Sequence, residues 1–334
     1  MIPNRKSNLS GIFNAKTIRR LISIGLVIIM AIIFTITTDA FLGFRNLTNL
    51  FKDAAYIGII ALGMSFVMIG GGIDLSAGGI VCLAGILCVR ISRSGAPGII
   101  VLLGGVAIGM ICGAVNAGFI TKVRLTEFVA TLATGFVYTG LTLIFSFRQG
   151  NSITTVPVRN SSYLAMSGNI GGVHYITIIW IILTVILYLV LSKTKFGLYT
   201  YSIGSHPKSA QMSGVNNDRI KAIGYLICGA CSGLAAAMQV ALLRASPANI
   251  GTGYEFRAIA ACVVGGVVLG GGKGDTISAF IGSLFLMMLL NGLFKFGLST
   301  SSEYVLQGVI IIIATTFDAI FNRITTKRLL ALAR

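Results

Sequence analysis

One carboxylate stands between two long apolar segments, in the run Gly70-Gly71-Gly72-Ile73-Asp74-Leu75-Ser76. A charged side chain is costly at membrane depth, so Asp74 is expected to face protein or a water-filled cavity. The three glycines favour a break in the helix, because glycine weakens helical structure. Irregular backbone is tolerated inside a membrane only where it is buried in protein or lines a cavity. The run therefore predicts a polytopic membrane protein in which a solute docks or passes.

Two roles are open for Asp74 and Ser76. Their side chains can cap the broken helix and hold its glycine turn, or they can bind the solute directly. We favour the structural role, because a negative group stabilises the start of a helix and a neutral solute needs few fixed charges.

Glu255 is the second carboxylate of interest, in Gly253-Tyr254-Glu255-Phe256-Arg257. It can form an ion pair with Arg257 at the membrane interface, or it can be a polar group near the outer end of a pathway. Glu127, beside Lys122 and Arg124, is interpreted as a charge at the cytoplasmic interface.

Other patterns exclude common kinds of site. The run 270–276 resembles a phosphate-binding loop, but Gly274 follows the lysine where Ser or Thr is needed, and Val267 replaces the first glycine. The two histidines, His174 and His206, have no ligand cluster around them. No nucleophile–base arrangement is present. The chain is therefore expected to be no enzyme in its own right and to bind no cofactor or metal.

Composition places the chain in the membrane. Of its 334 residues 55% are hydrophobic and 10% charged, and the mean hydropathy is +0.91. The net charge of +17 comes from Lys and Arg residues that mostly occupy short gaps between apolar runs. That pattern indicates the positive-inside rule rather than nucleic-acid binding. The six cysteines, including Cys228 and Cys231, lie in apolar runs and are interpreted as small packing residues.

The apolar runs predict an all-α bundle with about ten crossings, since one crossing needs about 20 apolar residues. They are Ile18–Thr38, Ala54–Ile69, Ile73–Ile91, Ile99–Ile120, Phe128–Phe147, Ile176–Leu191, Ile220–Leu242, Ala258–Leu269, Ile277–Phe296 and Tyr304–Phe321. A transmembrane domain over 18–321 then lies between cytoplasmic tails at 1–17 and 322–334. The basic residues favour both termini inside, an outer loop at 148–175 and a cytoplasmic loop at 192–219.

The cytoplasmic loop contains a predicted short amphipathic helix. Ser205 is the expected N-cap, Pro207 suits the first turn, and Gly214 is the expected stop. Such a helix suits docking into a partner's groove. The alternative is an ordinary solvated loop helix.

Four blocks resemble the permease subunits of the ribose/galactose/autoinducer branch of ATP-binding-cassette importers, over about Phe41 to Asp318. The first, GGIDLSAG at 71–78, is similar to the family's GGIDLS-x-G signature. The others are Gly113–Gly118 with Phe128–Leu132, Thr194–Val215, and Gly253–Gly274. The chain departs from the family at Thr126 and Glu127, where proline is usual, and at Arg257, where an acidic residue is usual.

The resemblance implies a type II-like permease bundle in a bacterial inner membrane, paired with an identical or paralogous permease. Two cytoplasmic ATPases would use ATP and Mg, and an extracytoplasmic binding protein would deliver the sugar. The residues implied to couple to the ATPase are Pro207, Lys208, Ser209, Ala210, Met212, Gly214 and Val215. Those expected at the pathway or its hinge are Gly71, Gly72, Asp74, Ser76, Asn116 and Glu255.

A monosaccharide or sugar-derived signal is the expected substrate, because a neutral, hydroxyl-rich solute needs few fixed charges along its path. Two alternatives are open. One is an ion-gradient-driven secondary transporter, for which inverted repeats would be expected, and no repeat is recognisable in the sequence. The other is a permease of the same family for nucleosides or branched-chain amino acids.

Overall fold

The structure, a computed structural model, describes residues 6–38, 40–149 and 152–295, with a few isolated positions between 305 and 316. The side chains it describes are mainly those of residues 21–38, 40–146 and 157–295. The expected tenth crossing, 304–321, and the predicted tail 322–334 lie almost wholly outside these residues. At the other end α1 begins at Lys6, so most of the segment predicted as an N-terminal tail is helical.

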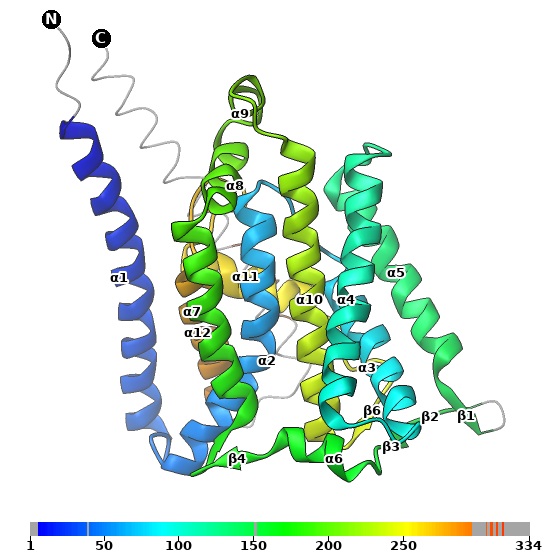
Figure 1. The fold of residues 1–334 in the computed structure, drawn as a ribbon. Helices are drawn as coiled ribbons and strands as arrows, with labels where there is room; N and C mark the ends of the chain where they lie inside the picture. The colour runs from blue at the N-terminus through cyan, green and yellow to red at the C-terminus, as the bar shows by residue number, and fades with distance from the viewer. Residues whose placement is uncertain are drawn as a thin grey trace, which may run out of the picture.

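Helices form most of the described chain (Figure 1). They are α1 (Lys6–Thr37), α2 (Phe44–Ile69), α3 (Ala77–Arg93), α4 (Gly98–Thr121), α5 (Glu127–Phe145), α6 (Ser161–Leu164), α7 (Tyr175–Lys193), α8 (Lys195–Ser205), α9 (Pro207–Met212), α10 (Asn217–Leu243), α11 (Tyr254–Gly265) and α12 (Thr276–Lys295), with a 3-10 turn at Ala165–Ser167. Two-residue and three-residue strands connect some of them: β1 (Phe147–Gln149), β2 (Ser152–Thr154), β3 (Val156–Pro157), β4 (Asn169–Ile170), β5 (Val173–His174) and β6 (Ala245–Ser246).

Six of the described helices are long and apolar enough to cross a membrane: α2, α4, α5, α7, α10 and α12. A shorter apolar stretch, Leu21–Thr37, lies in α1. The third and eighth predicted crossings correspond to α3, with 17 residues, and α11, with 12. Because α11 is far shorter than the roughly 20 residues that one crossing requires, it does not span the bilayer alone. The protein is an all-α, multi-pass membrane protein.

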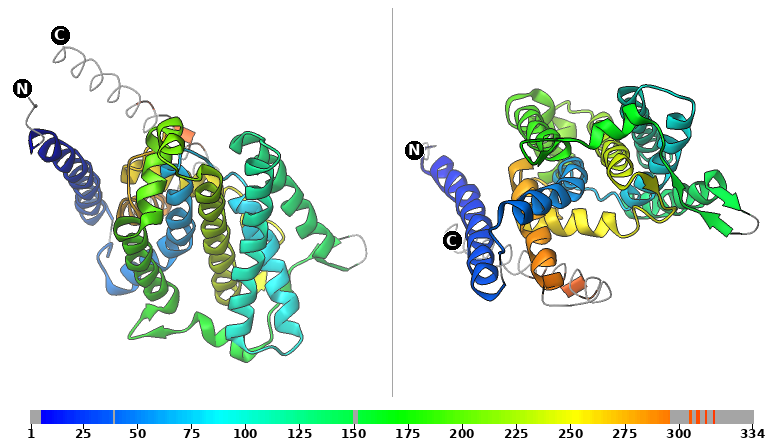
Figure 2. Two further views of the ribbon diagram at one scale, coloured as in Figure 1. Left: turned by 45° about the horizontal axis from the view of Figure 1, so that its top comes forward. Right: turned by 90° about the horizontal axis from the view of Figure 1, so that it is seen from below.

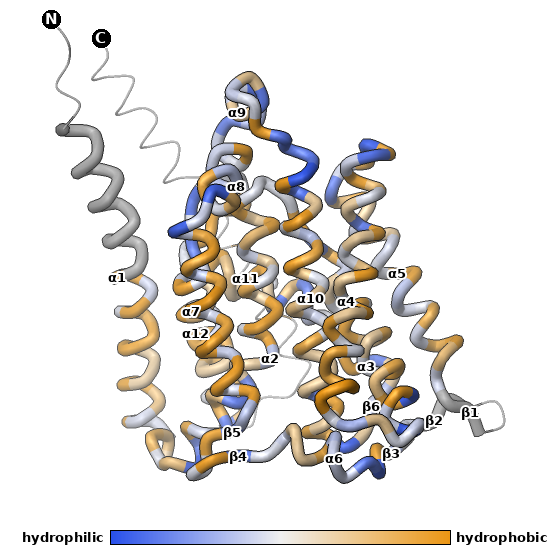
Figure 3. Tube along the Cα trace, viewed as in Figure 1, coloured by the Kyte–Doolittle hydropathy of each residue, from blue (hydrophilic) through white to orange (hydrophobic). Residues whose placement is uncertain are grey.

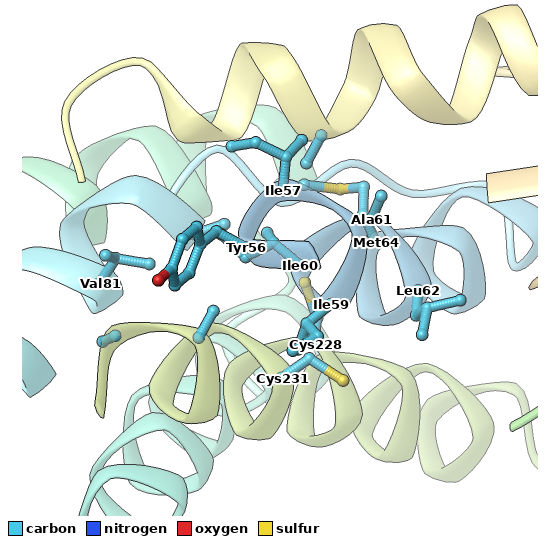
Figure 4. Close-up of a cluster of buried hydrophobic side chains, with 14 of the residues drawn as sticks. Tyr56, Ile57, Ile59, Ile60, Ala61, Leu62, Met64, Val81, Cys228 and Cys231 are labelled. Carbon is cyan, nitrogen blue, oxygen red and sulfur yellow. The ribbon is translucent and has the colours of Figure 1, made fainter. Parts of the chain in front are cut away.

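The helix α2 lies at the centre of the bundle. It contacts α7, α10, α11 and α12, and every residue from Ala54 to Ile69 is buried (Figures 1 and 2). Cys228 and Cys231 of α10 pack against this helix, where Gly63 leaves room for them (Figure 4). All six cysteines are buried and unbridged, so the structure places them as packing residues.

A second close contact joins α4 to α10. Gly105, Gly109 and Gly113 face Gly229 and Gly233, and a Cβ on Gly109 would overlap the carbonyl oxygen of Gly229. Small residues at four-residue spacing let two helix backbones approach closely within a membrane. The four-residue spacing of these glycines in the sequence predicts a row of small residues along α4. In the structure this row packs against Gly229 and Gly233 of α10.

The two ends of the bundle differ. At one end α8 and α9 project beyond the helices, and at the other the short strands and α6 cross beneath them (Figure 1). Polar residues gather at both ends and apolar residues between them (Figure 3). The strands pair antiparallel, and β3 bonds with β6, which ties the predicted outer loop to the end of α10.

Candidate functional site

The predicted break follows α2. Ile69 is the last helical residue, and Gly71 takes a left-handed conformation with φ +86°. The N–H of Gly71 donates to the Met68 carbonyl at 3.0 Å, and the N–H of Gly72 donates to the Val67 carbonyl at 2.9 Å. This pair of bonds is the Schellman ending of a helix, which needs a residue that tolerates positive φ. Residues 70–76 then form an irregular linker that leads into α3.

A buried polar cluster surrounds the end of this linker. The Asp74 carboxyl accepts from the N–H of Ser76 at 2.9 Å and from its hydroxyl at 2.6 Å. Asn116 of α4 donates to the Ser76 hydroxyl at 2.7 Å and accepts from Thr134 and Tyr138 of α5 at 2.6 and 3.2 Å. Three separate segments, the linker, α4 and α5, therefore meet through hydroxyl, amide and carboxyl groups. The cluster fixes where α3 begins relative to α4 and α5.

Two further side chains hold the linker by its backbone. Thr131 of α5 accepts from the N–H of Leu75 at 3.0 Å. Tyr225 of α10 donates its hydroxyl to the Ile73 carbonyl at 3.2 Å. Backbone groups at membrane depth need such partners, because water is not available to them.

Three of the predicted pathway residues are fully enclosed. Asp74, Ser76 and Asn116 are each 0% exposed, and Gly72 is buried beneath Glu127 and Tyr225. Of the predicted glycine pair only Gly71 is exposed. In this conformation the cluster is therefore a joint between helices rather than the wall of an open channel.

Glu255 lies at the start of α11 and faces the start of α3. Its carboxylate packs directly over Gly78, where a Cβ would overlap it. An acidic group beside a helix N-terminus is stabilised by the free N–H groups and the dipole of that helix. Arg257 stacks over the Tyr254 ring at 5.3 Å, and Tyr254 accepts a hydrogen bond from Gln239.

The predicted cytoplasmic helix is α9, and it is shorter than expected. It covers Pro207–Met212 rather than extending to Val215, although Gly214 ends it with φ +83° as predicted. The expected N-cap at Ser205 is wrong, because Ser205 is the last residue of α8 and His206 precedes α9. A proline at the first turn starts a new helix whatever precedes it, so α8 and α9 abut without a polar cap between them.

One side of α9 packs inward and the other is open. Ala210 is buried against Ile203 and Ile220, whereas Pro207, Lys208, Ser209 and Gly214 are exposed. Met212 is 90% exposed, although methionine is apolar.

A glycine contact connects this projection to the broken helix. Gly204 of α8 lies against the carbonyl of Ile69, and the N–H of Gly272 donates to the same carbonyl at 2.8 Å. Gly271 packs on Gly71 and Gly204. Three segments far apart in the sequence thus meet at bare backbone. We call this contact of Gly71, Gly204, Gly271 and Gly272 around the Ile69 carbonyl the glycine joint.

Neither the glycine joint nor the part that the run before α12 takes in it was predicted from the sequence. The rejected phosphate-loop run precedes α12, where Asp275 accepts from the N–H of Ser278 at 2.8 Å and from its hydroxyl at 2.9 Å. In both places an aspartate accepts from the N–H and the hydroxyl of a following serine, two residues on at Asp74 and three residues on at Asp275. The shared signal was present, because three glycines followed by Asp, Ser and Ala occur in both runs.

No group of three or more His, Cys, Asp or Glu residues that could hold a metal ion occurs among the described residues. What the site offers is a helix break, buried neutral polar contacts and a projecting helix joined to that break. These features suit a change in the relative positions of helices rather than a chemical reaction.

Comparison with known proteins agrees with this geometry. The sequence model of the family described as "Branched-chain amino acid transport system / permease component" matches residues 46–315. The chain belongs to this permease family. The permease is 37% identical over 290 residues to the ribose import permease protein of Bacillus subtilis, covering 87% of this chain and 89% of the relative.

Other relatives are similar over comparable lengths. The ribose import permease protein of Escherichia coli K12 is 32% identical, covering 88% of the permease and 92% of the relative. The galactose/methyl galactoside import permease protein of Haemophilus influenzae is 31% identical, with coverage of 88% and 92%. No solved structure is significantly similar to the permease. These relatives are permeases rather than enzymes, as expected for a translocation subunit.

Proposed function

We propose that the permease is the translocation subunit of an ATP-driven importer that carries a monosaccharide or a sugar-derived signal. The observation that carries this proposal is similarity to ribose and galactose import permeases over almost nine-tenths of the chain. The buried polar cluster is assigned to movement rather than to sugar binding, because Asp74, Ser76 and Asn116 are fully enclosed.

ATP hydrolysis then takes place in separate cytoplasmic ATPase subunits, which use ATP and Mg, and the permease itself holds no cofactor. The exposed face of α9 docks into a groove of the ATPase. An extracytoplasmic binding protein delivers the sugar to the opposite end. A second permease, identical or paralogous, completes the pathway.

Movement of α9 is the proposed trigger. Its displacement reaches the broken helix through the glycine joint, so that the bundle opens alternately to each side. In this scheme Gly71, Gly72, Asp74, Ser76 and Asn116 act as a hinge rather than as sugar ligands. Glu255, at the start of α11, lies nearer to the pathway.

The proposed setting is a bacterial inner membrane with both termini in the cytoplasm and about ten segments at membrane depth, in a type II-like bundle. The positive-inside pattern supports this orientation. A cysteine at Ser161, an exposed residue of α6, is expected to react with an impermeant thiol reagent in intact cells. Labelling only after lysis would reverse the orientation.

Two alternatives make different predictions. An ion-driven transporter would work without an ATPase, and the family description itself names branched-chain amino acids. The deciding experiment is to purify the permease from detergent-solubilised membranes and assay the ATPase activity of whatever co-purifies, with a panel of sugars, nucleosides and amino acids on the binding protein. Hydrolysis stimulated only by a sugar-loaded binding protein supports the proposal. Transport by the permease alone under an ion gradient refutes it.

A further inference from the structure

Two ion pairs join the loop before α5 to the start of α10. The Arg124 guanidinium forms a bidentate pair with the Asp218 carboxylate, at 2.7 and 2.8 Å. Three residues further along each segment, Lys221 of α10 pairs with Glu127, the first residue of α5, at 2.5 Å. The charges are crossed, since each segment contributes one cation and one anion. The bidentate Arg124–Asp218 pair fixes the relative orientation of its two groups as well as the distance between them.

The outer pair is held by an unusual backbone. Arg124 has φ +66°, a left-handed conformation that residues with a β-carbon rarely adopt. The conformation places the guanidinium against Asp218. Strain of this sort persists only where surrounding contacts determine it, and it collects at switch regions.

Both sides of the inner pair reach the broken helix. On the α5 side Glu127 packs over Gly72, and its carbonyl accepts from the Thr131 hydroxyl at 2.8 Å, which in turn accepts from Leu75. On the α10 side Tyr225, one turn after Lys221, donates to Ile73.

The same helix start is tied to α9. The Asn217 amide donates to the Pro207 carbonyl at 2.9 Å, and the N–H of Val215 donates to the Ala210 carbonyl at 3.1 Å. Any displacement of α9 therefore moves the residues that carry Asp218 and Lys221. The ion pairs are the next contacts on the way to α5.

We propose that Arg124–Asp218 and Glu127–Lys221 form a two-pair latch, which holds α5 to α10 in this conformation and releases when α9 is displaced. Through the latch, a displacement of α9 by the ATPase reaches the linker 70–76 by a route separate from the glycine joint. The latch rests on the proposed function, because an ATPase must move α9. It assigns positioning roles to four residues, of which the sequence analysis interpreted only Glu127, as an interface charge.

Charge reversal tests the latch. Arg124→Asp and Asp218→Arg are each expected to lower sugar uptake and sugar-stimulated ATPase activity about fivefold or more, the usual size of a coupling effect between sites. The double variant R124D/D218R restores the pair with its charges exchanged and is expected to recover to within about twofold of wild type. The pair E127K/K221E is treated in the same way.

Matched controls come from the same two turns. Lys122→Glu and Arg219→Glu make the same charge change, and neither residue takes part in an ion pair among the described residues. Both variants are expected to keep wild-type coupling. Fluorescence-detected size-exclusion chromatography checks that every variant folds.

A second measurement does not depend on folding differences. Cysteines at positions 124 and 218, bridged by a short reducible bis-thiosulfonate, should stop uptake, and a reductant should restore it. The six native cysteines are buried and stay out of the reaction. Uptake that continues across the bridge overturns the latch, as does a charge-swapped double variant no better than its single parents.

The two proposals fail differently. If the wild-type complex shows sugar-stimulated hydrolysis and the swap fails, the latch is wrong and the importer assignment stands. If no ATPase co-purifies with the wild-type chain, the proposed function is wrong and the latch falls with it.

Discussion

Replacing Asp74 by two different residues separates a structural role from a ligand role. Asp74 accepts two bonds from Ser76 through Oδ1, and the whole side chain is buried. Asp74→Asn keeps an oxygen acceptor at this position. Asp74→Ala removes it and leaves the N–H and hydroxyl of Ser76 buried without that acceptor.

The structure sets the expected size of the difference. A buried donor that loses its partner costs about 1–3 kcal/mol, so two donors cost roughly 2–6 kcal/mol in the alanine variant. The asparagine variant is expected to lose about 1 kcal/mol, the net value of a weakened hydrogen bond. The two losses differ by about 1–5 kcal/mol, so at about 2–4 °C per kcal/mol for a large domain the alanine variant should melt about 2–20 °C below the asparagine variant.

Thermal melting in detergent, followed by size-exclusion chromatography, measures this difference, and uptake at graded sugar concentrations measures apparent affinity. Asp53→Ala is the control, because that half-exposed carboxylate pairs with Lys52 at 3.5 Å and should cost less than about 1 kcal/mol. Equal melting of the alanine and asparagine variants would refute the capping argument. A loss of sugar affinity in Asp74→Asn, with melting unchanged, would make Asp74 a ligand instead.

Three further substitutions test other contacts. Gly109→Ala should lower the melting temperature, because its Cβ overlaps the backbone of α10, whereas Gly118→Ala on the same helix meets no atom within 4 Å and should not. Gly204→Ala should uncouple ATP hydrolysis from uptake while expression stays normal, and Gly270→Ala, whose Cβ meets one side-chain atom at 3.9 Å, should leave coupling intact. Burial and then the Lys52 charge lower the pKa of His174 below its usual 6.5, so the folded protein binds the proton less readily than the unfolded chain. Stability should therefore be lost as the pH falls below about 6.5, and melting at pH 7.5 and 5.5 should differ less in His174→Gln.

Local features of the fold were predictable from sequence, because each depends on neighbouring residues. Three glycines followed by Asp74 and Ser76 predicted the break after Ile69, and the structure has it. Pro207 and Gly214 gave the start and the stop of α9, although not the residue before it. Long apolar runs gave α4, α5, α7, α10 and α12 to within about three residues, the usual uncertainty of helix ends.

Contacts between distant segments were not predictable in this way. Nothing in the composition of residues 270–272 shows that they meet Gly204, because glycine has no side chain whose pattern could report a partner. The two ion pairs were also not predictable, because each joins residues far apart in the sequence. Glu127 looked like an interface charge, and only the folded chain brings Lys221, at the start of α10, beside it at the start of α5. Hydrophobicity was misleading as well. The apolar run at 258–269 was interpreted as a crossing because of its composition, although α11 has only 12 residues.

The close packing of α4 on α10 has a mechanical consequence. Two helices in backbone contact along several turns cannot slide past each other, so they behave as one stiff lever. Its longer arm, α10, has 27 residues, which at about 1.5 Å each gives roughly 40 Å from the end near α9 to the end near β6. A tilt of only about 5° at the α9 end would then carry the far tip through about 3–4 Å, by the length of the rod alone. Because β6 follows α10 and pairs with β3, that amplified swing would arrive at the outer loop without any helix having to bend.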